Sequence, residues 1–142
     1  MSEAKRSVSL HRLSRGRFLA TNLHGDTLEV GEGGDGAFTP VELLLTALAA
    51  CSAVDVDYIV GKRAEPTSFR VRSEADKVRD DAGNHLTDLV VTFDLAFEDS
   101  EAGRAAREVL PRAVRQSHDR LCTVSRTIEL GAAVTQRVGS LD

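Results

Sequence analysis

Tryptophan is absent from this chain, and aromatic side chains make up only 4% of its 142 residues. A hydrophobic core must therefore be built mainly from Leu, Val, Ala and Ile. The hydrophobic fraction of 42% and the charged fraction of 28% are typical of a soluble globular protein and exclude wholesale disorder. At this length we expect a single domain, residues 1–142, that is large enough to bury a core of its own.

Long apolar runs are also missing, since no segment has the roughly eighteen consecutive apolar residues that a membrane span requires. Residues 1–6 have no apolar stretch behind them of the kind that a signal peptide has. The net charge is −4, and acidic and basic residues are mixed along the chain, which gives no electrostatic reason to expect nucleic acid or a membrane as partner. These features predict a cytoplasmic protein.

Motifs for metal binding and for hydrolysis are absent as well. The four histidines are scattered, and neither a CxxC nor an HExxH motif occurs. A GxSxG motif, typical of a serine hydrolase, is not found either. We therefore expect no metal and no cofactor.

The first part of the chain predicts short strands and a loop. Strand-like stretches occur at residues 7–10, 17–21 and 27–30, with a tight turn at 24–26 between the last two. Residues 31–36 contain four glycines. This run lacks both the Walker lysine and GxGxxG spacing, so a flexible loop is favoured over a phosphate-binding loop.

A long helix is predicted to begin at Thr39-Pro40-Val41-Glu42. Thr39 can cap the helix, Pro40 suits its first position, and Glu42 completes a capping box. The helix is apolar on nearly every side as far as Val56, and Gly61 is a natural stop. A helix of this kind is expected to be buried on all sides, wrapped by a sheet or by a second subunit.

The second half of the chain predicts two strands, two helical runs and a closing strand. The strands span residues 68–73 and 89–97, joined by a polar turn at 80–84. A helix begins at Ser100, is expected to break or kink at Pro111, and is followed by a short helical run up to Cys122. Residues 125–130, with an extension through 133–135, are predicted to form the last strand. The fold class is therefore α+β.

Only two cysteines are present, Cys51 at the end of the apolar run and Cys122 after a second helical run. Two cysteines in a chain without an export signal are more often free or redox-active than a structural disulfide. A thiol beside a positive charge or a second thiol can be reactive, whereas one in a dry apolar helix is inert.

The segment from Thr39 to Val56, with its Pro-x-Glu-Leu-Leu helix ending in two small residues and Cys51, resembles the OsmC/Ohr family. The stretch Ser117-His118-Asp119-Arg120-Leu121-Cys122-Thr123-Val124-Ser125 resembles that family's second motif. The order of strands and helices is similar to the family's over nearly the whole chain. The details are closest to a less characterised OsmC-like branch.

This resemblance implies an OsmC-like fold, with antiparallel sheets wrapped around the central helix in an intertwined homodimer. It also implies a thiol peroxidase that reduces organic hydroperoxides or hydrogen peroxide. The resemblance implies that Cys51 is the peroxidatic cysteine and that Cys122 converts its sulfenic acid to a disulfide. A dithiol reductant such as a lipoylated protein then resets the pair. A sulfenic acid is reversible only if a thiol reaches it before more oxidant does.

Two further catalytic residues of the family have only partial counterparts. The hydroperoxide-resistance branch carries a Glu directly after the helix-opening Pro, whereas here Val41 takes that place and Glu42 follows. Glu42 is therefore either a catalytic partner or only part of the capping box. The family's catalytic arginine, which pairs with that Glu, corresponds here to Arg17 or to Arg15. Alternatively, these arginines are only solvated charges on a strand.

Two residues near the cysteines allow opposite readings. His118 precedes Cys122 by four positions and could lower the pKa of that thiol, although interaction with a helix dipole is favoured. Asp55 follows Cys51 by four positions and would raise the pKa of the Cys51 thiol. The presence of both cysteines favours the peroxidase, whereas Val41 and Asp55 favour the alternative, a dimeric small-molecule-binding or thiol-switch module without turnover.

Overall fold

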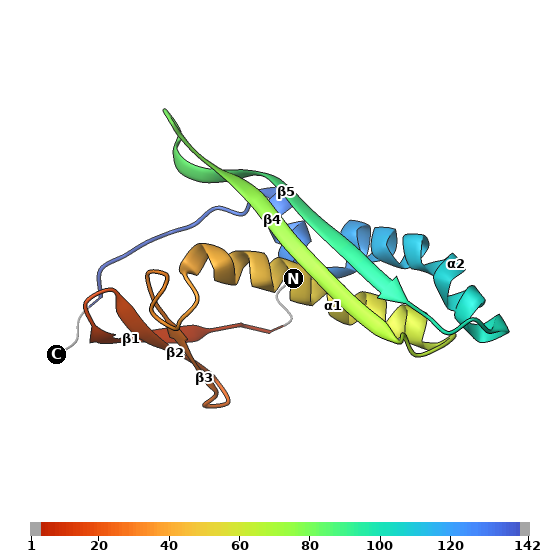
Figure 1. Ribbon diagram of the computed structural model, residues 1–142. Helices are drawn as coiled ribbons and strands as arrows, with labels where there is room; N and C mark the ends of the chain where they lie inside the picture. Colours follow the sequence, from red (N-terminus) through yellow and green to blue (C-terminus); the bar gives the residue numbers. More distant parts are fainter. Residues whose placement is uncertain (1–3, 140–142) are drawn as a thin grey trace. The chain divides into compact units, whose positions relative to one another are not determined.

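The computed structural model describes residues 4–139 (Figure 1). The chain forms two compact units, one ending at Thr46 and the other beginning at Ala47. The boundary falls inside the long helix α1 (Pro40–Gly61). The content of helices and antiparallel sheets confirms the α+β class.

The first unit contains a three-stranded antiparallel sheet in the order β1-β2-β3. Its strands are β1 (Val8–Ser14), β2 (Arg17–Asn22) and β3 (Thr27–Val30), so the predicted strands are confirmed and the first is longer than expected. The side chain of Asn22 closes the turn between β2 and β3 by accepting the N–H groups of His24 and Asp26.

The glycine-rich segment 31–36 is a loop, as predicted, and one carboxylate organises it. Asp35 accepts the backbone N–H groups of Glu32 (3.1 Å) and Ala37 (3.2 Å). The hydrogen bond from Glu32, with that from Ala37 and the nearby Arg17 guanidinium, lowers the pKa of Asp35 below its ordinary value. These N–H groups are already bound by the chain's own carboxylate, which disfavours phosphate binding here.

Helix α1 begins with the predicted capping box and ends at the predicted glycine. The Thr39 N–H donates to Glu42 Oε1 (2.8 Å), and the Glu42 N–H donates to Thr39 Oγ1 (3.1 Å). The prediction that this helix is buried on all sides is wrong for the chain by itself. Only one stripe is buried, while Val54 and Tyr58 are 55% and 76% exposed. The stripe consists of Leu48, Ser52, Val56 and Val60.

The second unit contains a long β-hairpin, formed by β4 (Ser68–Asp80) and β5 (Gly83–Ala96). Both strands extend well beyond their predicted ends toward the turn. That extension is rich in charged residues and has no apolar alternation, so backbone pairing across the turn, rather than burial, sustains it. Gly83, with φ of 97°, follows the two-residue turn in a backbone conformation that favours glycine.

Helix α2 (Glu101–Gln116) begins where the sequence predicts, because the Ser100 side chain accepts the Gly103 N–H (3.0 Å). The predicted break at Pro111 is not found, and the helix continues to Gln116. Burial of Ala106, Val109 and Ala113 on one face holds the segment together despite the lost N–H donor. A π-helical turn, η1 (Ser117–Leu121), follows directly.

The predicted strand at residues 125–130 is wrong, since this segment is helix α3 (Thr123–Leu130). The segment has a cap at each end. Cys122 caps it through its sulfur, and Gly131 stops it with φ of 68° in the left-handed region. These local signals outweigh the β-branched residues that suggested a strand, and residues 133–135 form no regular structure.

The core of the second unit lies between the hairpin and the helices α1 and α2 (Figure 1). Side chains from three elements meet there. The buried cluster consists of Val56, Val60, Phe97, Ala106, Val109 and Ala113. Tryptophan is not needed, because valine, alanine and phenylalanine side chains fill this cluster.

Candidate active site

Cys51 and Cys122 lie together in the second unit, although 71 positions separate them (122 − 51). Cys51 projects from the middle of α1, and Cys122 precedes the first residue of α3. Cys122 and the backbone N–H groups of Val124 and Thr123 lie close enough to the Cys51 thiol to influence its pKa. Cys51 is half-buried, whereas Cys122 is fully buried.

Backbone hydrogen bonds fix the position of the Cys122 sulfur. It accepts the N–H of Ser125 at 3.3 Å, while the Cys122 N–H donates to the Ser117 carbonyl at 2.8 Å. Both sulfurs therefore lie at the N-terminus of α3, where free N–H groups and the helix dipole stabilise negative charge.

Burial is the largest influence on the pKa of Cys51 and raises it above the ordinary value of 9.0. The hydrogen bonds from Val124 and Thr123 act in the opposite direction, while the Cys122 sulfur raises the pKa further. Cys51 is thus a thiol at neutral pH in this structure, and the groups that would stabilise its thiolate are the N–H donors of α3.

Asp55 does not play the predicted part. Its carboxylate accepts a hydrogen bond from the Ser117 hydroxyl (Oγ to Oδ2, 2.8 Å), and burial and Cys122, rather than Asp55, account for the raised pKa of Cys51. Ser117 is only 1% exposed and lies at the start of η1.

His118 is held by two carboxylates rather than by Cys122. Its Nδ1 contacts Asp119 (2.8 Å) and its Nε2 contacts Glu129 on α3 (2.5 Å), so both ring nitrogens are occupied. The hydrogen bond to Asp119, followed by that to Glu129, raises the pKa of His118 above 6.5. The alternative in which His118 activates the Cys122 thiol is therefore not realised.

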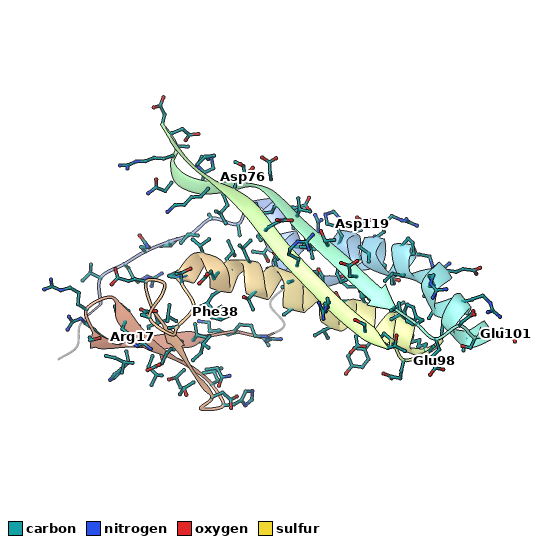
Figure 2. The ribbon with its side chains drawn as sticks, in the orientation of Figure 1. Arg17, Phe38, Asp76, Glu98, Glu101 and Asp119 are labelled. Atoms are coloured by element: carbon teal, nitrogen blue, oxygen red, sulfur yellow. The ribbon has the colours of Figure 1, made fainter. Side chains whose placement is uncertain are left out.

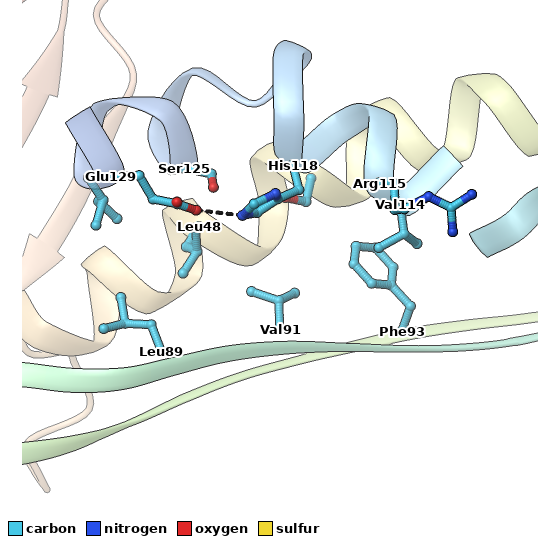
Figure 3. Close-up of a pocket in the computed structure, with 11 residues that line it drawn as sticks. Leu48, Leu89, Val91, Phe93, Val114, Arg115, His118, Ser125 and Glu129 are labelled. Carbon is cyan, nitrogen blue, oxygen red and sulfur yellow. Dashed lines mark hydrogen bonds and ion pairs between the residues drawn. The ribbon is translucent and has the colours of Figure 1, made fainter. Parts of the chain in front are cut away.

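A pocket of about 460 Å³ is lined by residues of α1, β5, α2, η1 and α3, but by neither cysteine (Figure 3). Its walls are mostly apolar, and the ion pair between His118 and Glu129 lies on one side (Figure 3). Ser52, next to Cys51, and Ser125, which donates to Cys122, belong to its lining. The other lining residues are Leu48, Leu89, Val91, Phe93, Val114, Arg115 and Ile128.

The other two candidate catalytic residues belong to the first unit, and each has a local partner. Arg17, on β2 (Figure 2), binds Glu29 at 2.9 Å and the backbone carbonyl of Asp35 at 2.8 Å. Glu42 binds the Thr39 N–H of the capping box. The catalytic role of Arg17 and Glu42 therefore stays a prediction.

Sequence reasoning did not anticipate Ser117 or the N–H groups of Thr123 and Val124. Their importance depends on a helix after Cys122, which was predicted to be a strand. The sequence signal for this helix is a possible cap at each end. Cys122 lies before its first residue, and Gly131 follows its last. Within residues 4–139 no group of three or more His, Cys, Asp or Glu side chains could hold a metal ion.

Comparison with known proteins identifies the family. The family model described as OsmC-like protein matches residues 32–137, which include both cysteines. The chain belongs to the OsmC-like protein family. An uncharacterized protein of Mycobacterium tuberculosis is 32% identical over 133 residues, covering 91% of this chain and 93% of its own length. Protein YhfA of Escherichia coli is 29% identical over 106 residues, covering 74% of this chain and 75% of YhfA.

Solved structures of other proteins share the fold. A hypothetical protein from Aquifex aeolicus superposes with a TM-score of 0.74 at 22% identity, covering 91% of this chain and 90% of that chain. The organic hydroperoxide resistance protein OhrB of Bacillus subtilis superposes with a TM-score of 0.58 at 14% identity, covering 87% and 90%. At these identities the likeness shows the fold alone.

Proposed function

We propose that this OsmC-like protein is a thiol peroxidase in which Cys51 reduces an organic hydroperoxide and Cys122 resolves the product. The observation that carries this proposal is the contact between the two thiols at the N-terminus of α3. The Bacillus subtilis protein of the same fold is a hydroperoxide resistance protein, which supports the same class of substrate.

The different burial of the two sulfurs supports these roles. Cys51 is the more accessible thiol, so an incoming peroxide meets it first, whereas Cys122 is fully buried behind it. The Cys51 thiolate attacks the hydroxyl oxygen of the hydroperoxide, and the O–O bond breaks. The sulfur is oxidised by two electrons to a sulfenic acid, and the alcohol leaves after taking up a proton.

Resolution uses the neighbouring sulfur. The Cys122 thiolate attacks the Cys51 sulfenic acid, a disulfide forms, and the hydroxyl leaves as water. A dithiol of the lipoamide class then returns two electrons and two protons to the pair and is itself oxidised to a cyclic disulfide. The N–H groups of Thr123 and Val124 lower the pKa of Cys51 and so favour its thiolate, against the larger effect of burial.

The apolar pocket, whose lining includes Ser52 next to Cys51 and Ser125 bonded to Cys122, favours an organic peroxide over hydrogen peroxide. Hydrogen peroxide gains nothing from apolar walls, whereas the carbon chain or ring of an organic peroxide is removed from water by them. We therefore expect cumene hydroperoxide to be reduced with a higher kcat/KM than hydrogen peroxide.

We also propose an intertwined homodimer of single-domain protomers. The apolar residues of α1 that the chain leaves exposed, including Val54 and Tyr58, would be covered by the partner. By length and composition alone α1 could cross a membrane, but the carboxylates of Asp55 and Asp57 are costly in lipid. Burial of α1 in a soluble, cytoplasmic dimer would account both for its apolar length and for its two carboxylates.

A dimeric binding or thiol-switch module is the second candidate. The raised pKa of Cys51 favours it, because a protonated thiol is a poor nucleophile. Such a module would bind an apolar ligand in the pocket and form the disulfide without rapid turnover of peroxide.

Peroxide turnover separates the two candidates. Cumene hydroperoxide and hydrogen peroxide would be supplied with dihydrolipoamide to the wild type, Cys51→Ser and Cys122→Ser. The peroxidase requires loss of activity in Cys51→Ser and overoxidation of Cys51 in Cys122→Ser. Wild-type activity equal to that of the variant lacking both cysteines would leave the module as the function.

A further inference from the structure

The thiol pair is connected to α1 at a second point, one helical turn from Cys51. Asp55 lies four residues after Cys51 on the same face of α1, a rise of about 6 Å. Its carboxylate binds the Ser117 hydroxyl at 2.8 Å. Thus α1 contacts the segment that carries Cys122 once through the thiols and once through this hydrogen bond.

Ser117 transmits this contact to Cys122 because all three of its polar groups are engaged. Its N–H donates to the carbonyls of Ala113 and Val114 at the end of α2. Its hydroxyl donates to Asp55, and its carbonyl accepts the Cys122 N–H at 2.8 Å. With 1% of its surface exposed, Ser117 has no access to water as a substitute partner.

The hydrogen bond from Cys122 to Ser117 closes the π-turn η1. A π-turn contains one residue more than an α-helical turn and is frequently found at functional sites. That extra residue sets the rotation of the chain at Cys122. Reversion to an α-helical turn would rotate Cys122 by about 100° away from Cys51.

We propose that Asp55, acting through Ser117, is a positioning residue for the disulfide between Cys51 and Cys122. It holds η1 in the register that presents the Cys122 sulfur to Cys51. The use of that disulfide in catalysis rests on the proposed function, but the positioning itself is a property of the dithiol and needs no peroxide.

A thiol–disulfide equilibrium tests this positioning directly. The protein would be incubated with mixtures of oxidised lipoamide and dihydrolipoamide, and the remaining protein thiols would be trapped and counted by mass spectrometry. In the exchange, two protons and two electrons pass from Cys51 and Cys122 to the sulfurs of lipoamide. The equilibrium constant reports the effective concentration of one protein thiol at the other.

Asp55→Ala and Ser117→Ala are each expected to lower this constant about 10- to 100-fold, the range of a hydrogen bond to a charged group. The double variant should lie close to the single variants, since both substitutions remove the same contact. Asp55→Asn should retain most of the wild-type value, because its amide oxygen can still accept the Ser117 hydroxyl. Asp57→Ala, an exposed carboxylate on the same helix, is the matched control and should be unchanged.

A merely structural role would lower the free energy of unfolding without shifting the redox equilibrium. Wild-type equilibrium constants in folded Asp55→Ala or Ser117→Ala would therefore overturn the proposal. Should Asp55→Ala fail to fold, Ser117→Ala and Asp55→Asn decide the question. Absence of peroxide turnover with an intact wild-type equilibrium would refute the peroxidase and leave the positioning role standing.

Discussion

Replacement of Glu42 separates a helix cap from a catalytic carboxylate. In the structure its carboxylate accepts only the Thr39 N–H at 2.8 Å among the described residues, and its own N–H binds Thr39 Oγ1 at 3.1 Å. The charge also lies in the first turn of α1, where a carboxylate interacts favourably with the helix dipole. The capping hydrogen bonds and the dipole interaction both stabilise the folded protein and have no part in catalysis.

The expected magnitudes follow from these contacts. Glu42→Ala loses the cap and the charge and should lower the free energy of unfolding by about 0.5–2 kcal/mol. For a domain of this size that corresponds to a decrease in Tm of about 2–8 °C. Glu42→Gln keeps an acceptor for the Thr39 N–H and should cost only about 0.3–1 kcal/mol. Glu65→Ala, at an exposed position, is the control.

Thermal unfolding by circular dichroism and peroxide turnover would be measured on the same samples. We expect both Glu42 variants to keep the wild-type kcat/KM for cumene hydroperoxide at a temperature where they are fully folded. A decrease of about tenfold or more in Glu42→Gln, with Tm near that of the wild type, would refute the capping account and assign Glu42 to catalysis.

Three further predictions test other parts of the structure. The His118 pKa is raised in the folded protein, so its ion pairs stabilise the fold fully below about pH 6.5 and this contribution is lost as the pH rises through the folded-state pKa. The deficit in unfolding free energy of His118→Asn, measured in urea, should therefore be larger at about pH 5.5 than at about pH 9; an equal deficit would contradict the ion pairs. The pH midpoint of Cys51 alkylation by iodoacetamide should lie above the ordinary thiol value of 9.0, and a midpoint below it would contradict the dominance of burial. Pro111→Ala restores an N–H inside α2 and should raise the free energy of unfolding in urea by about 1–3 kcal/mol, whereas a decrease would show that the proline ring packs favourably.

Much of the fold could be predicted because its signals are local. The capping box at Thr39 and Glu42 begins α1, and Ser100 begins α2, as the sequence indicates. These caps depend on residues three positions apart and need no tertiary information. Strands β2 and β3 were found because the turn at residues 24–26 separates two short strand-like runs.

The errors arose where tertiary packing or an unusual cap decides the structure. Pro111 is tolerated inside α2 because the helix face on either side of it is buried. Residues 125–130 contain β-branched side chains, but Cys122 and Gly131 cap them into a helix. Cysteine is not a residue that is ordinarily sought as an N-cap.

At the candidate site, the pairing of Cys51 with Cys122 could be expected from the family resemblance but not from spacing. The contact of Asp55 with Ser117 could not be expected at all, because it joins residues 62 positions apart through a π-turn that has no sequence signature. Charge alone suggested that Asp55 acts on Cys51, whereas geometry gives it a hydroxyl partner.

The most direct test of the central claim is the mass of the protein after one equivalent of cumene hydroperoxide, followed by alkylation of free thiols. We predict that the wild type loses two hydrogen atoms and both alkylation sites. Cys122→Ser should instead gain one or more oxygen atoms on Cys51. A wild-type protein that still carries two alkylated cysteines while the peroxide remains unconsumed would contradict the account.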